Sequence, residues 1–163
     1  MTSYLFRMPS GIPGAVSREE NKTIEPVPFD STTPFAGYGL FGKIVSGKLQ
    51  PIGAGDAATA VYCLLVRPYP TQGANASDPL GTSVPPTSGI ANALRRGYMT
   101  VKLNAGTAAF TGAVYVRVAN AAAGKPIGGI EAAADSTNTI LITGAIFMSA
   151  ADASGNVEIS YNI

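Results

Sequence analysis

The chain has 163 residues, 11 of them basic and 10 acidic, so its net charge is +1. That balance argues against a general electrostatic attraction to nucleic acid or anionic membranes, and we expect neither as a partner. Histidine is absent and Cys63 is the only cysteine, which excludes an intramolecular disulfide and a Cys/His zinc site. The length fits one domain, and 19 Gly and 12 Pro favour short strands and many turns over long helices.

Residues 1–36 differ from the rest of the chain because prolines interrupt them at short intervals. These prolines should prevent any helix or central strand from running far. Isolated large apolar side chains stand between them, which is unusual for a solvated tail. We predict an extended N-terminal arm over 1–36 and a β domain over 37–163. The arm either straps across its own domain or docks on another subunit through its apolar anchors.

The next segments predict short strands joined by turns. We expect a strand over 40–45, a turn at Ser46-Gly47, a short strand to Ile52 and a turn over 53–56. Residues 57–67 become continuously apolar, which predicts a strand buried on both faces and makes Cys63 a buried thiol rather than a reactive one. Five prolines then predict a long loop over 68–87.

Residues 88–97 are the best helix candidate, and residues 97–118 follow as a predicted hairpin or meander. Ser88 suits the N-cap, Gly97 suits the position after the last turn, and Ile90, Ala93 and Leu94 share a helical face. In 98–103 and 114–118 apolar and polar residues alternate with a period of two, as in strands with one buried face. Gly and Asn between them supply turn chemistry.

The C-terminal third adds further strands and turns. We expect strands over 126–132, 139–143, 145–148 and 157–163, with turns at 135–138 and 152–156. The sequence therefore predicts an all-β fold: a small antiparallel sandwich or barrel, jelly-roll-like, with one short helix and the extended arm.

Motifs that would carry chemistry are weak. Residues 37–42 match G-x-G-x-x-G, but no helix pattern follows, and residues 42–49 approach a phosphate-binding loop with Leu49 in place of the hydroxyl. Asp152, Ser154 and Asn156 are better explained by a β-turn than by a calcium site. Without histidine the commonest catalytic base is missing. We expect no cofactor, no metal and no enzymatic activity.

Several stretches together resemble the structural cement, or capsid decoration, proteins of tailed bacteriophages. The resembling residues are 8–14 with 16–18, 34–35, 38–39, 66–72, 85–90, 94–98, 114–118, 124–131 and 151–157. The resemblance implies a structural virion protein, made in the host cytoplasm, that binds the outer capsid surface between coat-protein capsomers. It implies the major capsid protein and other copies of the chain, as a homodimer or homotrimer, as partners.

We predict that arm residues, a loop start and a basic pair form the contact surface with neighbouring coat or cement subunits. The candidates are Tyr4, Phe6, Met8, Ile12, Pro13 and Arg18 on the arm, Arg67 and Tyr69 at the loop start, and Arg95 and Arg96. The main alternative is a β-sandwich module that recognises host-surface glycans. The absence of tryptophan counts against it, because glycan sites usually present aromatic platforms.

Overall fold

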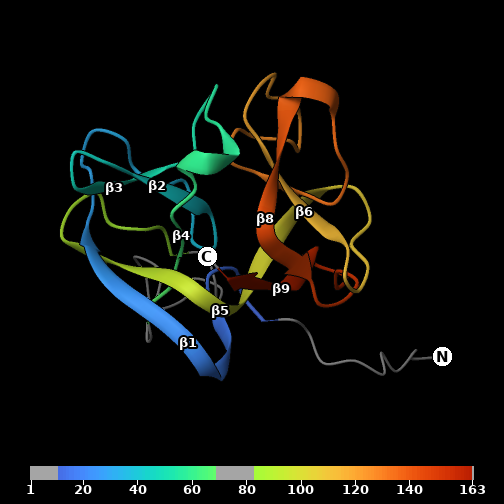
Figure 1. Ribbon diagram of the computed structural model, residues 1–163, viewed down its shortest axis with the longest axis horizontal. Helices are drawn as coiled ribbons and strands as arrows, with labels where there is room; N and C mark the ends of the chain where they lie inside the picture. The colour runs from blue at the N-terminus through green and yellow to red at the C-terminus, as the bar shows by residue number, and fades with distance from the viewer. Residues whose placement is uncertain (1–10, 69–82, 163) are drawn as a thin grey trace.

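The computed structural model describes residues 11–68 and 83–162 and confirms the all-β class. Nine strands and two 3-10 turns make up its regular structure, and the strands join into one sheet (Figure 1). The strands are β1 (Val16–Pro28), β2 (Phe41–Val45), β3 (Lys48–Pro51), β4 (Cys63–Leu65), β5 (Ile90–Ala105), β6 (Ala113–Arg117), β7 (Ile130–Glu131), β8 (Thr139–Phe147) and β9 (Asn156–Asn162). The 3-10 turns are η1 (Ala58–Ala60) and η2 (Ser136–Asn138).

The C-terminal strands close into a ring with the second half of β5, which gives a small barrel. Going round it, β5 pairs with β7, β7 with β6, β6 with β8, β8 with β9, and β9 with β5 again. All these pairings are antiparallel except β5–β7, which is parallel. We call this ring the second lobe; it lies on the right in Figure 1.

The first half of β5 belongs to a separate group of strands, which we call the first lobe. There β5 lies between β1 and β4, β4 pairs with β2, and β2 with β3. A single bridge between Phe29 and Leu49 connects the end of β1 back to β3. The 16-residue strand β5 is thus shared by both lobes, as Figure 1 shows.

Each lobe has its own hydrophobic core, and β4 separates the two. The first core holds Phe29, Leu49, Cys63 and Leu65, and the second holds Leu64 with the inner residues of β6, β8 and β9. Successive side chains on a strand point to opposite faces, so a strand between two cores must be apolar throughout. The predicted burial of this segment on both faces is confirmed, although the strand covers only Cys63–Leu65.

The predicted helix over 88–97 is wrong, because these residues form the beginning of β5. Ala93 packs in the first core and Leu94 in the second, and both are fully buried. Adjacent residues reach opposite cores on a strand, whereas a helix would place them on one side. Tertiary pairing with β1 and β4 therefore overrides the local helical pattern.

The predicted hairpin within 97–118 is also wrong, although both of its strands exist. β7, which follows β6 in the chain, lies between β5 and β6 and pairs with each of them. The alternation itself predicted burial correctly: Met99, Val101, Val114 and Val116 are fully buried. Periodicity reports which face of a strand is covered, and it does not report the neighbouring strand.

Residues 16–28 form β1, which pairs only with β5 among the strands and is therefore an edge strand, not the helix or central strand that the prolines were expected to prevent. Phe29 donates its N–H to the Gly89 carbonyl, and alternation along the strand then directs the nitrogens of Pro26 and Pro28 away from β5. No N–H is needed at those positions. Both prolines lie on the outer edge of β1, where they also discourage the addition of a further strand.

Candidate functional site

The predicted contact residues that the structure describes lie in three regions. Ile12 and Pro13 lead into β1, and Arg18 lies within it. Arg67 follows β4, while Arg95 and Arg96 are neighbours in the middle of β5. Tyr4, Phe6, Met8 and Tyr69 lie outside the described residues, so their contacts remain predictions.

Residues 11–15, which we call the strap, are fixed to the body of the same chain. The Gly14 N–H donates to the Thr100 carbonyl at 2.8 Å, and the Gly14 carbonyl accepts from the Arg67 N–H at 2.8 Å. The Thr100 N–H in turn donates to the Ala15 carbonyl at 2.9 Å. The strap thereby covers Thr100, which is 1% exposed although it lies on the polar face of the alternating pattern.

Gly14 is required for this close approach. Its φ of +87° is a left-handed conformation that residues with a Cβ rarely adopt. A Cβ added there would lie 2.4 Å from the Tyr38 Cβ and 3.1 Å from the Arg67 Cβ. The strap is therefore built for contact with its own body, as in the first of the two predicted alternatives for the arm, at least over residues 11–15.

Arg67 is buried under the strap instead of lying free on the surface. It is 9% exposed, its guanidinium lies 4.5 Å from the centre of the Tyr38 ring, and its Nε donates to the Pro13 carbonyl at 3.0 Å. Its Nη1 also donates to the Ser83 hydroxyl. Burial lowers the pKa of the Arg67 guanidinium. This side chain positions the root of the arm, and a partner could reach it only by displacing the strap.

Arg18 makes a surface cluster with residues of β5 and β9. Its guanidinium donates two hydrogen bonds to Glu158, at 2.8 and 3.1 Å, and lies 4.1 Å from the centre of the Tyr98 ring. Ser17 donates a further bond to the same carboxylate at 2.6 Å. The hydrogen bonds to Glu158 raise the pKa of Arg18. The Arg18 side chain is still 48% exposed, so a partner subunit has access to it.

Arg95 and Arg96 point in opposite directions, as neighbours on a strand must. Arg95 is half-buried, lies 3.8 Å from the centre of the Tyr62 ring and donates to the Tyr62 carbonyl at 3.0 Å. Tyr62 donates its hydroxyl to Glu25 at 2.5 Å, and this bond raises the pKa of the tyrosine. Arg96 is exposed and lines a shallow polar hollow of about 190 Å³, together with Asn21, Gly97, Tyr98, Ser160, Tyr161 and Asn162.

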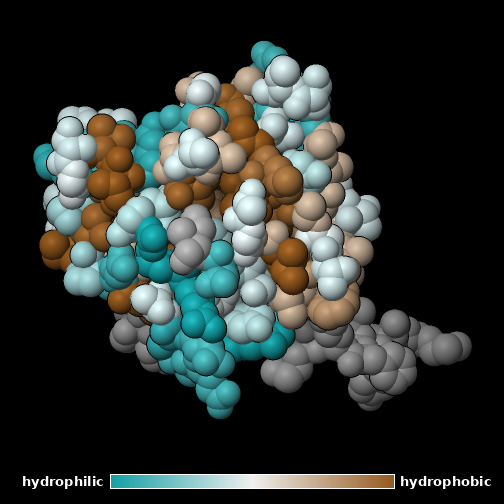
Figure 2. Space-filling view, viewed as in Figure 1, coloured by the Kyte–Doolittle hydropathy of each residue, from teal (hydrophilic) through white to brown (hydrophobic). Residues whose placement is uncertain are grey.

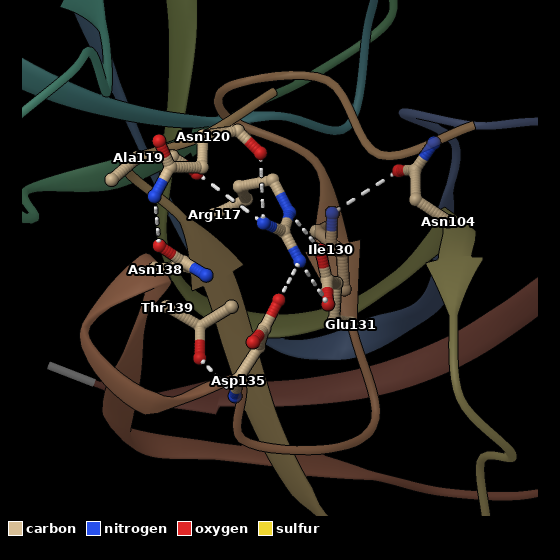
Figure 3. Close-up of polar contacts among 9 residues, drawn as sticks. All are labelled: Asn104, Arg117, Ala119, Asn120, Ile130, Glu131, Asp135, Asn138 and Thr139. Carbon is tan, nitrogen blue, oxygen red and sulfur yellow. Dashed lines mark hydrogen bonds and ion pairs between the residues drawn. The ribbon is translucent and has the colours of Figure 1, made fainter. Parts of the chain in front are cut away.

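A buried ionic cluster holds the loops at one end of the second lobe (Figure 3). Arg117 donates to Glu131 at 2.5 and 3.2 Å and to Asp135 at 2.5 Å, and it also bonds the carbonyls of Ala119 and Asn120. Arg117 and Glu131 are 1% and 2% exposed. The hydrogen bonds from Arg117 lower the pKa of Asp135. The cluster therefore joins β6 to β7 and to the loops that hold Ala119, Asn120 and Asp135.

The described residues include carboxylates and one cysteine, the kinds of side chain that could bind a metal ion. No group of three carboxylate, cysteine or histidine side chains among them is placed to hold a metal ion. Cys63 is fully buried, which confirms the prediction of a buried thiol, and burial raises the pKa of this thiol to about 12. In the described part of the chain, no helix is both long and apolar enough to cross a membrane.

The second lobe also carries an apolar surface that was not predicted from the sequence, which we call the β6–β8 face. Figure 2 shows apolar side chains gathered over β8 on the side of the molecule that faces the viewer. Phe110, Leu141 and Ile146 are 66%, 47% and 39% exposed. The signal was present in the sequence: residues 103–116 and 136–151, which supply this face, contain no charged side chain.

The comparisons with known proteins agree on one kind of protein. The model of a family described as XM1 gp53 minor capsid protein matches residues 1–161. A solved structure described as the capsid of Myoviridae phage XM1 contains a chain that is similar in fold, with a TM-score of 0.70 and 16% sequence identity. The match covers 98% of this chain and 95% of that one. No curated protein matches.

The family match and the shared fold together define a phage capsid-associated structural protein. The family match spans nearly the whole sequence. The chain belongs to the XM1 gp53 minor capsid protein family, and the recognition of a bacteriophage capsid component from the sequence is confirmed.

Proposed function

We propose that this chain is a cement protein, which binds the outer surface of the assembled phage capsid between coat-protein capsomers and stabilises the shell. Its partners are the major capsid protein and other copies of itself. The role is structural and not catalytic. Arg18, Arg96 and the arm residues that precede the strap are the first candidates for contact with neighbouring subunits.

The observation that carries the proposal is the way in which the strap fixes the root of the arm. This root is held on the body because the Gly14 N–H donates to the Thr100 carbonyl, while the carbonyls of Ala15 and Pro13 accept hydrogen bonds from Thr100 and Arg67. Residues that precede a fixed root begin from a defined point, so less entropy is lost when they dock on a neighbour. A protein that binds only the assembled shell stabilises that shell by mass action. Each equivalent site that is occupied adds the same stabilising free energy.

The test compares the full chain with a variant that lacks residues 2–10. This deletion leaves the strap, β1 and every contact described above in place, whereas a longer deletion would remove Gly14 and begin to unravel β1. Shells assembled from coat protein alone are mixed with each form, and bound chain is measured by co-sedimentation. Shell stability is followed as the temperature at which these shells disassemble.

We expect the full chain to bind at saturable stoichiometry and to raise the disassembly temperature of the shells, and the truncated form to bind at least about tenfold more weakly. As a matched control, Lys48→Ala removes an exposed charge from the β2–β3 hairpin of the first lobe, and it should leave binding unchanged. If the full chain fails to bind assembled shells, the cement function is wrong. If the truncated form binds like the full chain, the role of the arm is wrong.

A further inference from the structure

We propose that the polar hollow beside Arg96 binds a carboxylate side chain of the coat protein. This is the hollow of about 190 Å³ described above, and it lies where β1, β5 and β9 run side by side. The inference rests on the proposed function and deepens it, because it states which chemical group the neighbouring subunit must supply at Arg96.

One wall of the hollow is a bulge in β1. This strand pairs with β5 at Arg18 and again at Thr23, but the two β5 partners are only two residues apart, so residues 19–22 lie opposite Gly97 alone. A Cβ on Gly97 would lie 3.3 Å from the Lys22 Cβ, so the bulge packs closely against β5. Figure 2 shows hydrophilic side chains gathered where β1 bends in Figure 1. Bulges commonly redirect side chains in this way beside functional sites.

The hollow contains one unpaired positive charge. Arg96 is exposed, and its guanidinium makes no hydrogen bond or ion pair with any described residue. The other polar residues that line the hollow carry amides, as Asn21 and Asn162 do, or hydroxyls, as Tyr98 and Ser160 do, and none carries a carboxylate. A guanidinium presents a planar fork of N–H donors that matches the two oxygens of a carboxylate. The hollow therefore lacks the one group that Arg96 binds best.

The charges around the hollow favour a single carboxylate over a polyanion. Glu19 and Glu20 are exposed on the bulge, and Glu158 lies on the neighbouring β9. These three carboxylates would repel an extended polyanion such as nucleic acid, whose binding requires several cations at once. One acidic side chain on a folded partner can reach Arg96 without meeting them all.

The acidic residues of this chain are almost all engaged already, which points to a different protein as the source. Among the described residues, each carboxylate except that of Glu20 is bonded within the chain, as Glu19 is to Lys22 and Asp56 to Lys43. Glu20 lies on the bulge itself. A two-fold contact that offered it to Arg96 of a second copy would also bring the exposed Glu19 side chains of both copies together. The carboxylate therefore comes from the coat protein.

The first experiment measures binding of the full chain to shells assembled from coat protein alone, by co-sedimentation. Arg96→Gln should weaken binding about tenfold or more, and Arg96→Glu about 100-fold, because it places two like charges together. The matched control is Lys48→Gln, which removes the same charge from an exposed position on the first lobe and should leave binding unchanged. Equal melting temperatures for the variants and the wild type verify that all of them are folded.

A second experiment identifies the source of the carboxylate. A water-soluble carbodiimide joins an amine to a carboxylate, with loss of water, only where the two groups are in contact. The amine introduced by Arg96→Lys should become linked to an Asp or Glu of the coat protein, and mass spectrometry of the linked peptides identifies that residue. Glu20→Gln should bind shells like the wild type and should leave this link unchanged.

Arg96→Gln that binds shells like the wild type would overturn the inference. So would Arg96→Lys that binds shells but gives no link from position 96 to the coat protein. A link to Glu20 of a second copy, or a loss of binding in Glu20→Gln equal to that in Arg96→Gln, would show that the coat protein is not the source. A full chain that fails to bind shells at all refutes the cement function together with this inference, whereas binding that does not depend on Arg96 refutes this inference alone.

Discussion

Arg117 illustrates how a single residue joins several segments. Its guanidinium connects β6 to Glu131 of β7 and to Asp135 in the turn before η2, almost out of contact with solvent. Removing one member of a buried ion pair leaves the other charge without compensation, which costs far more than losing a pair on the surface.

We therefore predict that Arg117→Met lowers the melting temperature by about 10 °C or more. The matched control is Arg18→Met, which breaks the half-exposed pair with Glu158 and should lower it by only about 2–3 °C. Differential scanning calorimetry measures both. Equal losses for the two variants would show that the Arg117 cluster does not stabilise the second lobe in this way.

Cys63 gives a prediction about pH. Burial raises the pKa of its thiol to about 12 in the folded chain, whereas an unfolded cysteine ionises near pH 8.5. Because the folded pKa is the higher one, the contribution of Cys63 to stability is complete below about pH 8 and decreases as the pH rises towards 12.

The free energy of unfolding should therefore decline above about pH 9, and this decline should be less steep in the variant Cys63→Ala. Urea titrations at pH 7 and pH 10 measure the difference. A thiol reagent should also label Cys63 slowly at pH 8 and rapidly in urea. Fast labelling of the folded protein at pH 8 would contradict the burial of this residue.

The strap is the element on which the geometry of the arm depends, and Gly14 is its tightest point. Gly14→Ala forces a Cβ to within 2.4 Å of Tyr38 and also strains a φ of +87°. Gly47→Ala is the matched control, because its φ of +77° is similarly left-handed but no atom lies within 4 Å of the new Cβ. Both variants incur backbone strain, and only one incurs the clash.

We expect Gly14→Ala to lower the free energy of unfolding by about 3 kcal/mol and Gly47→Ala by about 1 kcal/mol. Hydrogen exchange provides a local readout: the Thr100 amide, which donates to Ala15, should lose protection in Gly14→Ala alone. Unchanged protection of this amide would mean that the strap does not depend on the close approach of Gly14.

The elements also show what could be predicted from the sequence. Strands with one covered face, such as β6 and β9, were predicted because a period of two reports a single buried side. The start of β5 was mistaken for a helix because its apolar residues serve two cores, which removes the alternation. The closing of the sheet by β7 could not be predicted, since a two-residue strand carries almost no pattern.

Among the site residues, the exposed positions of Arg18 and Arg96 could be predicted from their polar neighbours, whereas the burial of Arg67 could not. Burial of Arg67 depends on the strap, which lies more than fifty residues away in the sequence. The ion pair between Arg117 and Glu131 could not be predicted from periodicity either, because the two residues lie on different strands, 14 positions apart in the sequence. Long-range contacts decide both.

At the scale of the whole molecule, the shared strand β5 couples the two lobes. Because its first half completes one lobe and its second half the other, we expect the chain to unfold in one cooperative step. Leu65→Ala removes a fully buried side chain from the first core and should cost about 2–5 kcal/mol.

The prediction is that hydrogen exchange in this variant accelerates by the same factor in β2, in the first lobe, and in β8, in the second. Val116→Ala, in the second core, serves as the reciprocal variant and should affect both lobes in the same way. If Leu65→Ala accelerates exchange in the first lobe alone, the lobes unfold independently and β5 does not couple them.

The central claim is that this member of a minor capsid protein family cements the shell from outside. The most direct measurement is a cryo-EM map of particles that contain the chain. The account predicts the two-lobed β body on the outer surface at the junctions between capsomers, with the residues before the strap in contact with a neighbouring subunit. Density on the inner surface, or an arm that touches no other chain, would contradict it.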